Sequence, residues 1–289
     1  MIISDIIVVV HESGDNMDAN FFLKNVSISL SEAQELCALY SPLKTNQDLY
    51  SCLASVLKGN TYTYDIKSMP REIYHSLLYQ YYPNEAAIKA AFSNQFFFNS
   101  KKHVTIYELN AGSSRVDMCK INGTSTAYEI KTDFDNFNRL EKQLSDYIQL
   151  FDRVYVICSE NRIEDIQKYL PDNVGIYTYR QTQRNNYRFQ EVKRPSCEDM
   201  LNPVFQLQLL SKSALSKYCS DYTLSERSDM EADILEHYKP GMINKIFKQC
   251  IKEKYEKRWT FIYENQSSIL DLDYQWFFKN EISPELIYQ

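Results

Sequence analysis

The chain has 289 residues, of which 44% are hydrophobic and 24% are charged, and its formal net charge is −6. This composition predicts a globular protein with a sizeable core and excludes a disordered chain. The acidic balance argues against a protein that coats nucleic acid generally, although local basic patches can still bind phosphate.

Three further classes of protein are excluded by residue usage. The seven cysteines are widely spaced and form no Cys-x-x-Cys pair, which favours a reduced chain over a disulfide framework or a zinc site. Only six glycines are present, and they form no glycine-rich phosphate loop. The apolar run at residues 1–10 is too short to span a membrane and lacks a basic leader. We therefore expect a cytoplasmic protein with no membrane partner.

Residues 1–82 are expected to form a mainly helical N-terminal region. The run at 1–10 is interpreted as a strand or a leader. Periodic apolar positions and flanking prolines then predict helices at 31–40, 46–58 and 71–81.

Residues 83–196 are expected to form an α/β core, and residues 197–289 a helical C-terminal region. The expected elements of the core, in chain order, are a helix from Asn84, strands at 103–109, 114–121 and 125–131, a helix at 134–150, a strand at 153–158, a helix at 161–170 and a strand at 174–179. A polar hairpin or linker is expected at 181–196. This order predicts a mixed central sheet flanked by helices.

The most specific signal is a pair of acidic residues twelve positions apart with a lysine beside the second. Asp117 lies in one expected strand, and Glu129 and Lys131 share one face of the next because side chains alternate along a strand. A short Asn122-Gly123 connection suits a hairpin. Folding the hairpin brings the three side chains together on one face.

Two carboxylates in such a hairpin form a hard oxygen site suited to Mg2+ or Mn2+. A metal ion held by Asp117 and Glu129 can activate a water, stabilise negative charge and assist a leaving oxygen. Lys131 is placed to position or deprotonate that water. The pattern therefore predicts a metal-dependent phosphodiesterase. Taken singly, Asp117 could cap the hairpin, and Glu-x-Lys is common on exposed strands.

With this order of elements and these residues, the chain resembles the PD-(D/E)XK nuclease superfamily, specifically its RecB-like branch. The resemblance covers roughly residues 83–180 and implies a restriction-endonuclease-like core with α-β-β-β-α-β order. Val116 stands where the family name has proline. The motif residues are Glu85, Asp117, Glu129-x-Lys131 and Gln143-x-x-x-Tyr147.

The resemblance implies a role for each motif residue. Asp117 and Glu129, with the backbone carbonyl of Ile130, would hold the metal, and Lys131 would be catalytic. Glu85 would be a helix carboxylate that assists metal or water, although an acid in the first helical turn is also favourable by itself.

Two further motif residues lie on the helix that follows the hairpin. Gln143 and Tyr147 are four residues apart, so they face the same way on a helix. The resemblance implies that they line the site or touch nucleic acid. Without it, they would be read as helix surface and core.

A second group of residues could bind nucleic acid. Arg180, Arg184, Tyr187 and Arg188 mix positive charge with an aromatic ring, which suits backbone contact and base stacking. A solvated hairpin loop explains them equally well.

The sequence thus predicts an Mg2+- or Mn2+-dependent nuclease, with DNA favoured over RNA, in phage defence or mobile-element biology. The alternative is a nucleic-acid-binding or interaction module on the same fold, catalytically weak or dependent on a partner. The helical flanks could carry a homodimer or a protein partner. A transcription regulator ranks third, because no clear helix-turn-helix is present.

Overall fold

The computed structural model describes residues 27–57, 70–182, 186–196 and 200–288. It divides into two compact units, one of Met1–Ala90 with Asn265–Gln289 and one of Ala91–Glu264. This division differs from the three expected parts, because the end of the chain groups with the N-terminal helices. The expected strand or leader at 1–10 lies outside the described residues.

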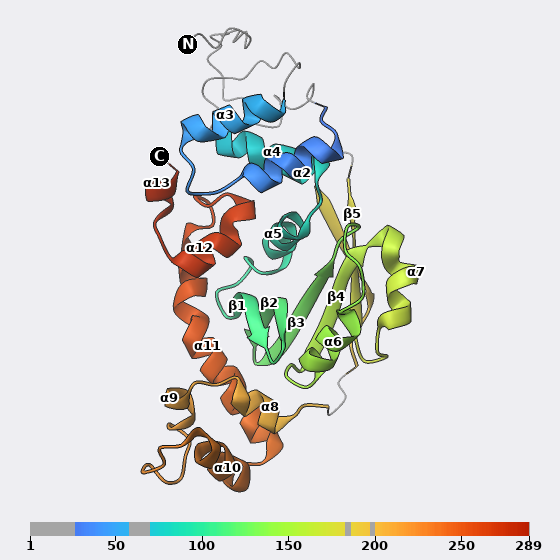
Figure 1. Cartoon of the computed structure of the whole chain (residues 1–289). Helices are drawn as coiled ribbons and strands as arrows, with labels where there is room; N and C mark the ends of the chain where they lie inside the picture. Colours follow the sequence, from blue (N-terminus) through green and yellow to red (C-terminus); the bar gives the residue numbers. More distant parts are fainter. Residues whose placement is uncertain (1–26, 58–69, 183–185, 197–199, 289) are drawn as a thin grey trace. The chain divides into compact units, whose positions relative to one another are not determined.

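The first unit is helical in its described part, as expected for the N-terminal region (Figure 1). Capping boxes start its first two helices, where Ser29 and Thr45 exchange hydrogen bonds with the acid three residues on. Asn84 caps the fourth, accepting from the Ala87 N–H at 2.9 Å. The elements are α2 (Leu30–Leu39), α3 (Asn46–Val56), α4 (Pro70–Tyr81), the start of α5 (Glu85–Phe96), η4 (Asp271–Asp273), α12 (Tyr274–Asn280) and α13 (Pro284–Ile287).

A buried carboxylate ties the end of the chain to the N-terminal helices. Asp273 is 2% exposed, and its Oδ2 accepts hydrogen bonds from Tyr40 Oη at 2.7 Å and Tyr288 Oη at 2.8 Å. His75 Nε2 lies 3.5 Å from the same oxygen. Arg71, also 2% exposed, donates to the Ile287 carbonyl at 3.0 Å. These hydrogen bonds offset the loss of hydration that burial imposes on the Asp273 carboxylate and the Arg71 guanidinium.

We predict that Asp273→Asn lowers the free energy of unfolding of the first unit by about 1–3 kcal/mol, because it weakens a buried acceptor of two hydroxyl groups. Urea denaturation and amide hydrogen exchange in α2 and α4 would measure the effect. Exposed Glu35 on α2 supplies the matched control, Glu35→Gln. Equal stability of the two variants would contradict the role given to Asp273.

The second unit contains a mixed sheet with its strands in sequence order (Figure 1). The β1–β2, β2–β3 and β5–β6 pairs are antiparallel, whereas β3–β4 and β4–β5 are parallel. The fold is therefore mixed α/β with helical flanks, as predicted at that level. The strands are β1 (Val104–Ala111), β2 (Ser114–Asn122), β3 (Thr124–Lys131), β4 (Arg153–Ser159), β5 (Gly175–Gln181) and β6 (Tyr187–Lys193).

The region predicted as a polar hairpin or linker at 181–196 forms a hairpin, in which β6 pairs antiparallel with β5. Two helices of the core differ from their predicted form. The helix predicted at 134–150 is only α6 (Leu140–Ile148), because Asp135 accepts from the Thr132 N–H at 2.7 Å and holds a turn before it. The helix predicted at 161–170 is broken into η2 (Glu160–Arg162), α7 (Ile163–Ile166) and η3 (Gln167–Tyr169).

Helices also follow the sheet in sequence. They are α8 (Pro203–Gln208), α9 (Lys212–Leu215), α10 (Arg227–His237) and α11 (Pro240–Asn265). Asp152 joins α11 to the sheet, since its carboxylate accepts from the Ser125 N–H at 2.7 Å, Asn244 Nδ2 at 2.7 Å and Lys248 Nζ at 2.9 Å. None of the described helices combines the length and apolar character needed to cross a membrane.

The Asp152 contacts make stability depend on pH. Burial raises the pKa of this carboxyl, but the hydrogen bonds from Ser125, Lys248 and Asn244 outweigh burial and lower it below 3.8. A lowered folded-state pKa stabilises the fold above the unfolded-state pKa and loses that effect as pH falls through the folded value. Asp152→Asn should therefore cost about 1–2 kcal/mol at neutral pH and progressively less below about pH 4.

Urea unfolding of the wild type and Asp152→Asn at several pH values would check this. Exposed Asp172, replaced by Asn, serves as the control. A stability difference between wild type and Asp152→Asn that stays constant down to pH 2 would contradict the assignment.

Candidate functional site

The β2–β3 hairpin brings the predicted acidic residues together. The ladder between the two strands ends at the pair Met118 and Tyr128, and Asp117 and Glu129 are the next residues beyond it. Asp117 Oδ2 accepts a hydrogen bond from the Ile130 N–H at 2.7 Å. The side chain thus takes the place of a backbone acceptor where the two strands separate. Because residues opposite each other point to one face, Asp117 and Glu129 share that face.

Glu129 is the most buried charge of the site, with 1% exposure. Its Oε1 accepts from Lys131 Nζ at 2.6 Å and from Gln143 Nε2 at 2.6 Å. Its Oε2 accepts from Tyr147 Oη at 2.8 Å. Two of the three donors come from α6, so the structure brings both helix residues of the predicted motif to this carboxylate.

Lys131 is the positive partner that makes this burial tolerable. It is 9% exposed, and its Nζ also donates to Gln143 Oε1 at 3.1 Å. A buried ion pair needs such additional hydrogen bonds to offset the loss of hydration. Gln143 supplies a donor to Glu129 and an acceptor to Lys131, so its amide bridges the two charges.

Tyr147 connects α6 to two strands through one hydroxyl group. Besides Glu129, the hydroxyl donates to the Arg115 carbonyl on β2 at 2.7 Å. It carries a single proton for these two acceptors. Burial, followed by the charge of Glu129, raises the pKa of Tyr147 above its usual value. The phenol therefore stays protonated and acts as a hydrogen-bond donor.

Glu108 also lies at this site, although it is not part of the sequence motif. The β1–β2 register places it opposite Asp117, and a carboxylate oxygen of each residue lies within 4.8 Å of the other. Arg115 Nε pairs with Glu108 at 2.5 Å. The signal in the sequence was an acid flanked by Tyr107 and Leu109 in a strand, opposite Asp117 across the short turn between β1 and β2.

The backbone at Glu108 is unusual. Its φ of +57° lies in the left-handed region, which costs a residue with a side chain about 1–2 kcal/mol. Strain of this kind concentrates at functional sites, where the surrounding structure maintains it. The left-handed conformation of Glu108 interrupts the ladder between β1 and β2 beside Asp117.

Glu85 belongs to the first unit, whereas the other motif residues belong to the second. It is the exposed first residue of α5, and its carboxylate pairs with Lys89 Nζ at 2.6 Å. This position agrees with a favourable acid at a helix N-terminus. Its expected role in assisting metal or water stays a prediction.

The expected nucleic-acid-binding residues have different surroundings. Arg180 and Arg188 are exposed, and Arg180 Nε lies 3.6 Å from Glu160. Tyr187 is only 8% exposed and packs edge-on against Tyr179, so its ring offers little free face to a base. Arg184 lies outside the described residues.

Comparison with known proteins places this chain in a family. The family model of bacteriophage P4 protein cII matches residues 79–274, which include all six strands of the sheet, α6 and α11. The chain belongs to the bacteriophage P4 protein cII family. Protein cII of Enterobacteria phage P4 is 29% identical over 124 residues, covering 43% of this chain and 47% of that protein. The matched segment thus spans less than half of the family's phage P4 member.

A solved structure of a protein of unknown function from Silicibacter pomeroyi also matches. It shares 15% identity over 47% of this chain and 74% of that chain, with a TM-score of 0.27. A score this low carries no argument about the fold, so the family assignment depends on sequence alone.

We predict that Tyr147→Phe lowers the free energy of unfolding by about 1–3 kcal/mol, because it leaves buried acceptors on Glu129 and Arg115 without their donor. Chemical denaturation would measure the change. Tyr222 is 93% exposed, and Tyr222→Phe is the matched control with an expected change near zero. Unchanged stability in Tyr147→Phe would show that the hydroxyl contributes nothing.

Proposed function

We propose that the second unit is a metal-dependent nuclease that hydrolyses phosphodiester bonds, with DNA favoured over RNA. The observation that carries the proposal is the buried contact between Lys131 Nζ and Glu129 Oε1 at 2.6 Å, with Asp117 on the same face. Charged groups are rarely buried in the middle of a sheet without a functional reason. The nuclease resemblance implies the same residues.

The oxygen donors fit a hard divalent cation. Asp117 and Glu129 would hold Mg2+ or Mn2+, with the Ile130 carbonyl as a further ligand implied by the resemblance. The Glu108 carboxylate, within 4.8 Å of that of Asp117, is an additional donor. A bound ion would supply Lewis acidity and a more acidic water.

Lys131 would act on the nucleophile and on developing charge. Its ammonium group can orient a water and counter negative charge on a phosphate. Gln143 holds this group at 3.1 Å through its side-chain oxygen, so we infer that Gln143 positions the lysine. Tyr147 donates to the other oxygen of Glu129, Oε2, and so holds the orientation of this carboxylate.

A second candidate function is a nucleic-acid-binding or interaction module on the same fold, catalytically weak or dependent on a partner. One observation favours it: both oxygens of Glu129 already accept hydrogen bonds from protein donors. A metal ion at Glu129 has to compete with the charge of Lys131. In that case the helical flanks would contact a second copy or another protein.

The family supports a biological setting. A relative from Enterobacteria phage P4 supports a role in mobile-element biology, whereas the proposed role in phage defence depends on the nuclease resemblance. The preference for DNA depends on the nuclease resemblance alone.

A cleavage assay tests the nuclease proposal. Purified full-length protein would be incubated with plasmid, linear duplex DNA, single-stranded DNA and RNA, each with Mg2+, Mn2+ or EDTA. We expect metal-dependent cleavage that Asp117→Ala and Lys131→Ala each reduce by at least about a hundredfold. Lys168, whose side chain is 69% exposed, supplies the control Lys168→Ala. Cleavage at the full rate by Lys131→Ala would disprove the mechanism.

Metal binding separates the two candidate functions. A nuclease site should bind Mn2+ in calorimetry, with affinity lost in Glu129→Ala and weakened in Glu108→Gln. A folded wild type that neither binds Mn2+ nor cuts any substrate would favour the binding module.

A further inference from the structure

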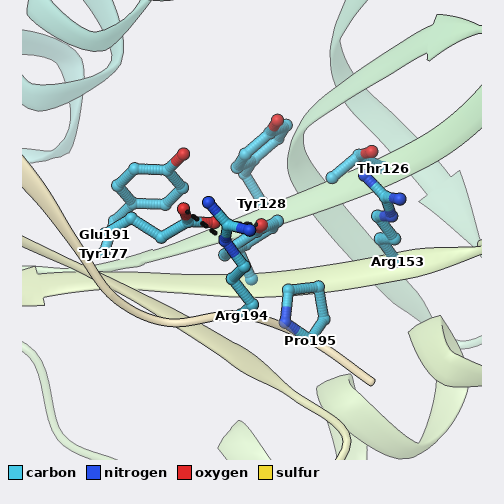
Figure 2. Close-up of a pocket in the computed structure, with 8 residues that line it drawn as sticks. Thr126, Tyr128, Arg153, Tyr177, Glu191, Arg194 and Pro195 are labelled. Atoms are coloured by element: carbon cyan, nitrogen blue, oxygen red, sulfur yellow. Dashed lines mark hydrogen bonds and ion pairs between the residues drawn. The ribbon is translucent and has the colours of Figure 1, made fainter. Parts of the chain in front are cut away.

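A polar pocket lies on the face of the sheet opposite the acidic site. It has a volume of about 390 Å³ and is lined by residues from β3 to β6 and the segment after β6 (Figure 2). Tyr128 on β3 lines it, whereas its neighbour Glu129 belongs to the acidic site. Because neighbouring side chains point to opposite faces of a strand, the pocket and the acidic site are separated by the sheet.

Aromatic rings form one side of the pocket. Tyr128 and Tyr155 stack with centroids 5.6 Å apart and an angle of 10° between their planes. Tyr177 lies 4.9 Å from Tyr155. Phe92 packs against Tyr128 at 5.2 Å and Tyr177 at 5.3 Å, so these rings are held in place. Tyr177 is half-buried and offers surface to a planar ligand.

A glycine makes room for this arrangement. A Cβ at Gly175 would lie 2.6 Å from the Tyr155 ring and 2.8 Å from Pro195, so any side chain would displace these two lining residues. Tyr155 Oη in turn donates to Glu191 Oε1 at 2.6 Å. The pocket is therefore a built feature of the β4–β5–β6 packing.

The charged groups of the pocket suit an anion. Arg153 and Arg194 line it with one carboxylate, Glu191, which leaves a net positive charge. Figure 2 shows Arg153 beside Thr126 and Arg194 extending past Glu191. Arg194 Nε pairs with Glu191 at 3.2 Å with its side chain 86% exposed, and such exposed pairs contribute little. Its guanidinium can turn to a ligand at small cost.

We propose that this pocket binds a nucleotide, with the base against the tyrosine surface and the phosphate held by Arg153 and Arg194. Guanidinium groups bind phosphate through paired hydrogen bonds, and aromatic side chains stack on bases. Glu191 supplies an acceptor for the amino group of a base. The proposal goes beyond the nuclease function and does not depend on it.

Two sources could provide this ligand: a free mononucleotide or the 5′-phosphorylated end of a strand. Calorimetry on the full chain, in EDTA, would compare the four ribonucleoside monophosphates, the matching nucleosides, inorganic phosphate and a short oligonucleotide with and without a 5′-phosphate. Tighter binding of the phosphorylated oligonucleotide than of any monophosphate would identify a strand end, and the reverse would identify a free nucleotide.

We expect Arg153→Gln and Arg194→Gln each to weaken nucleotide binding roughly ten- to a hundredfold, the loss typical of a charge-assisted hydrogen bond. Lys168→Gln, at an exposed lysine outside the pocket, should leave the affinity unchanged. Circular dichroism would confirm that each variant is folded.

Three results would overturn the proposal. They are no binding of any nucleotide or oligonucleotide, equal affinity for phosphate and nucleotide, and binding that Lys131→Ala weakens while both arginine variants retain it. The nuclease proposal is unaffected by the first two, because cleavage is measured separately.

Discussion

The arrangement of the second unit depends on neutralising one buried carboxylate. Glu129 is 1% exposed in the middle of the sheet, where an unpaired charge would cost several kcal/mol, on the order of 3–5 when a partner is removed. Lys131 from the same strand, and Gln143 and Tyr147 from α6, supply its donors. The helix α6 therefore has to pack against the sheet with Gln143 and Tyr147 facing Glu129, because the buried carboxylate needs both donors.

The same region is where regular strand pairing stops. Asp117 replaces a backbone acceptor for the Ile130 N–H, and Glu108 on the next strand adopts a positive φ. Both departures concentrate carboxylate oxygens between three strands. Backbone strain of this kind clusters at functional sites, and it is one of the observations behind the nuclease proposal for this face.

The two faces of the sheet differ because side chains alternate along each strand. One face carries Glu129 and Lys131, whereas the other carries Tyr128 and, on β4, Tyr155, whose rings stack. A step of one residue along β3, from Tyr128 to Glu129, thus separates the aromatic, cationic pocket from the acidic site. This separation allows both sites to be tested by independent variants.

The sequence by itself determined the contacts that depend on local geometry. Alternation placed Glu129 beside Lys131, the Asn122-Gly123 turn returned β3 onto β2, and helical spacing put Gln143 and Tyr147 on one face. Only the tertiary structure decided which distant residues meet. Glu108 became part of the site through the β1–β2 register, and the pocket of Arg153 and Arg194 formed through β4–β5–β6 packing. The acid at Glu108 is visible in its strand, but the sequence does not show which residues it faces, nor that Arg153 and Arg194 meet, because pairing between strands is fixed by the whole sheet and not by neighbouring residues.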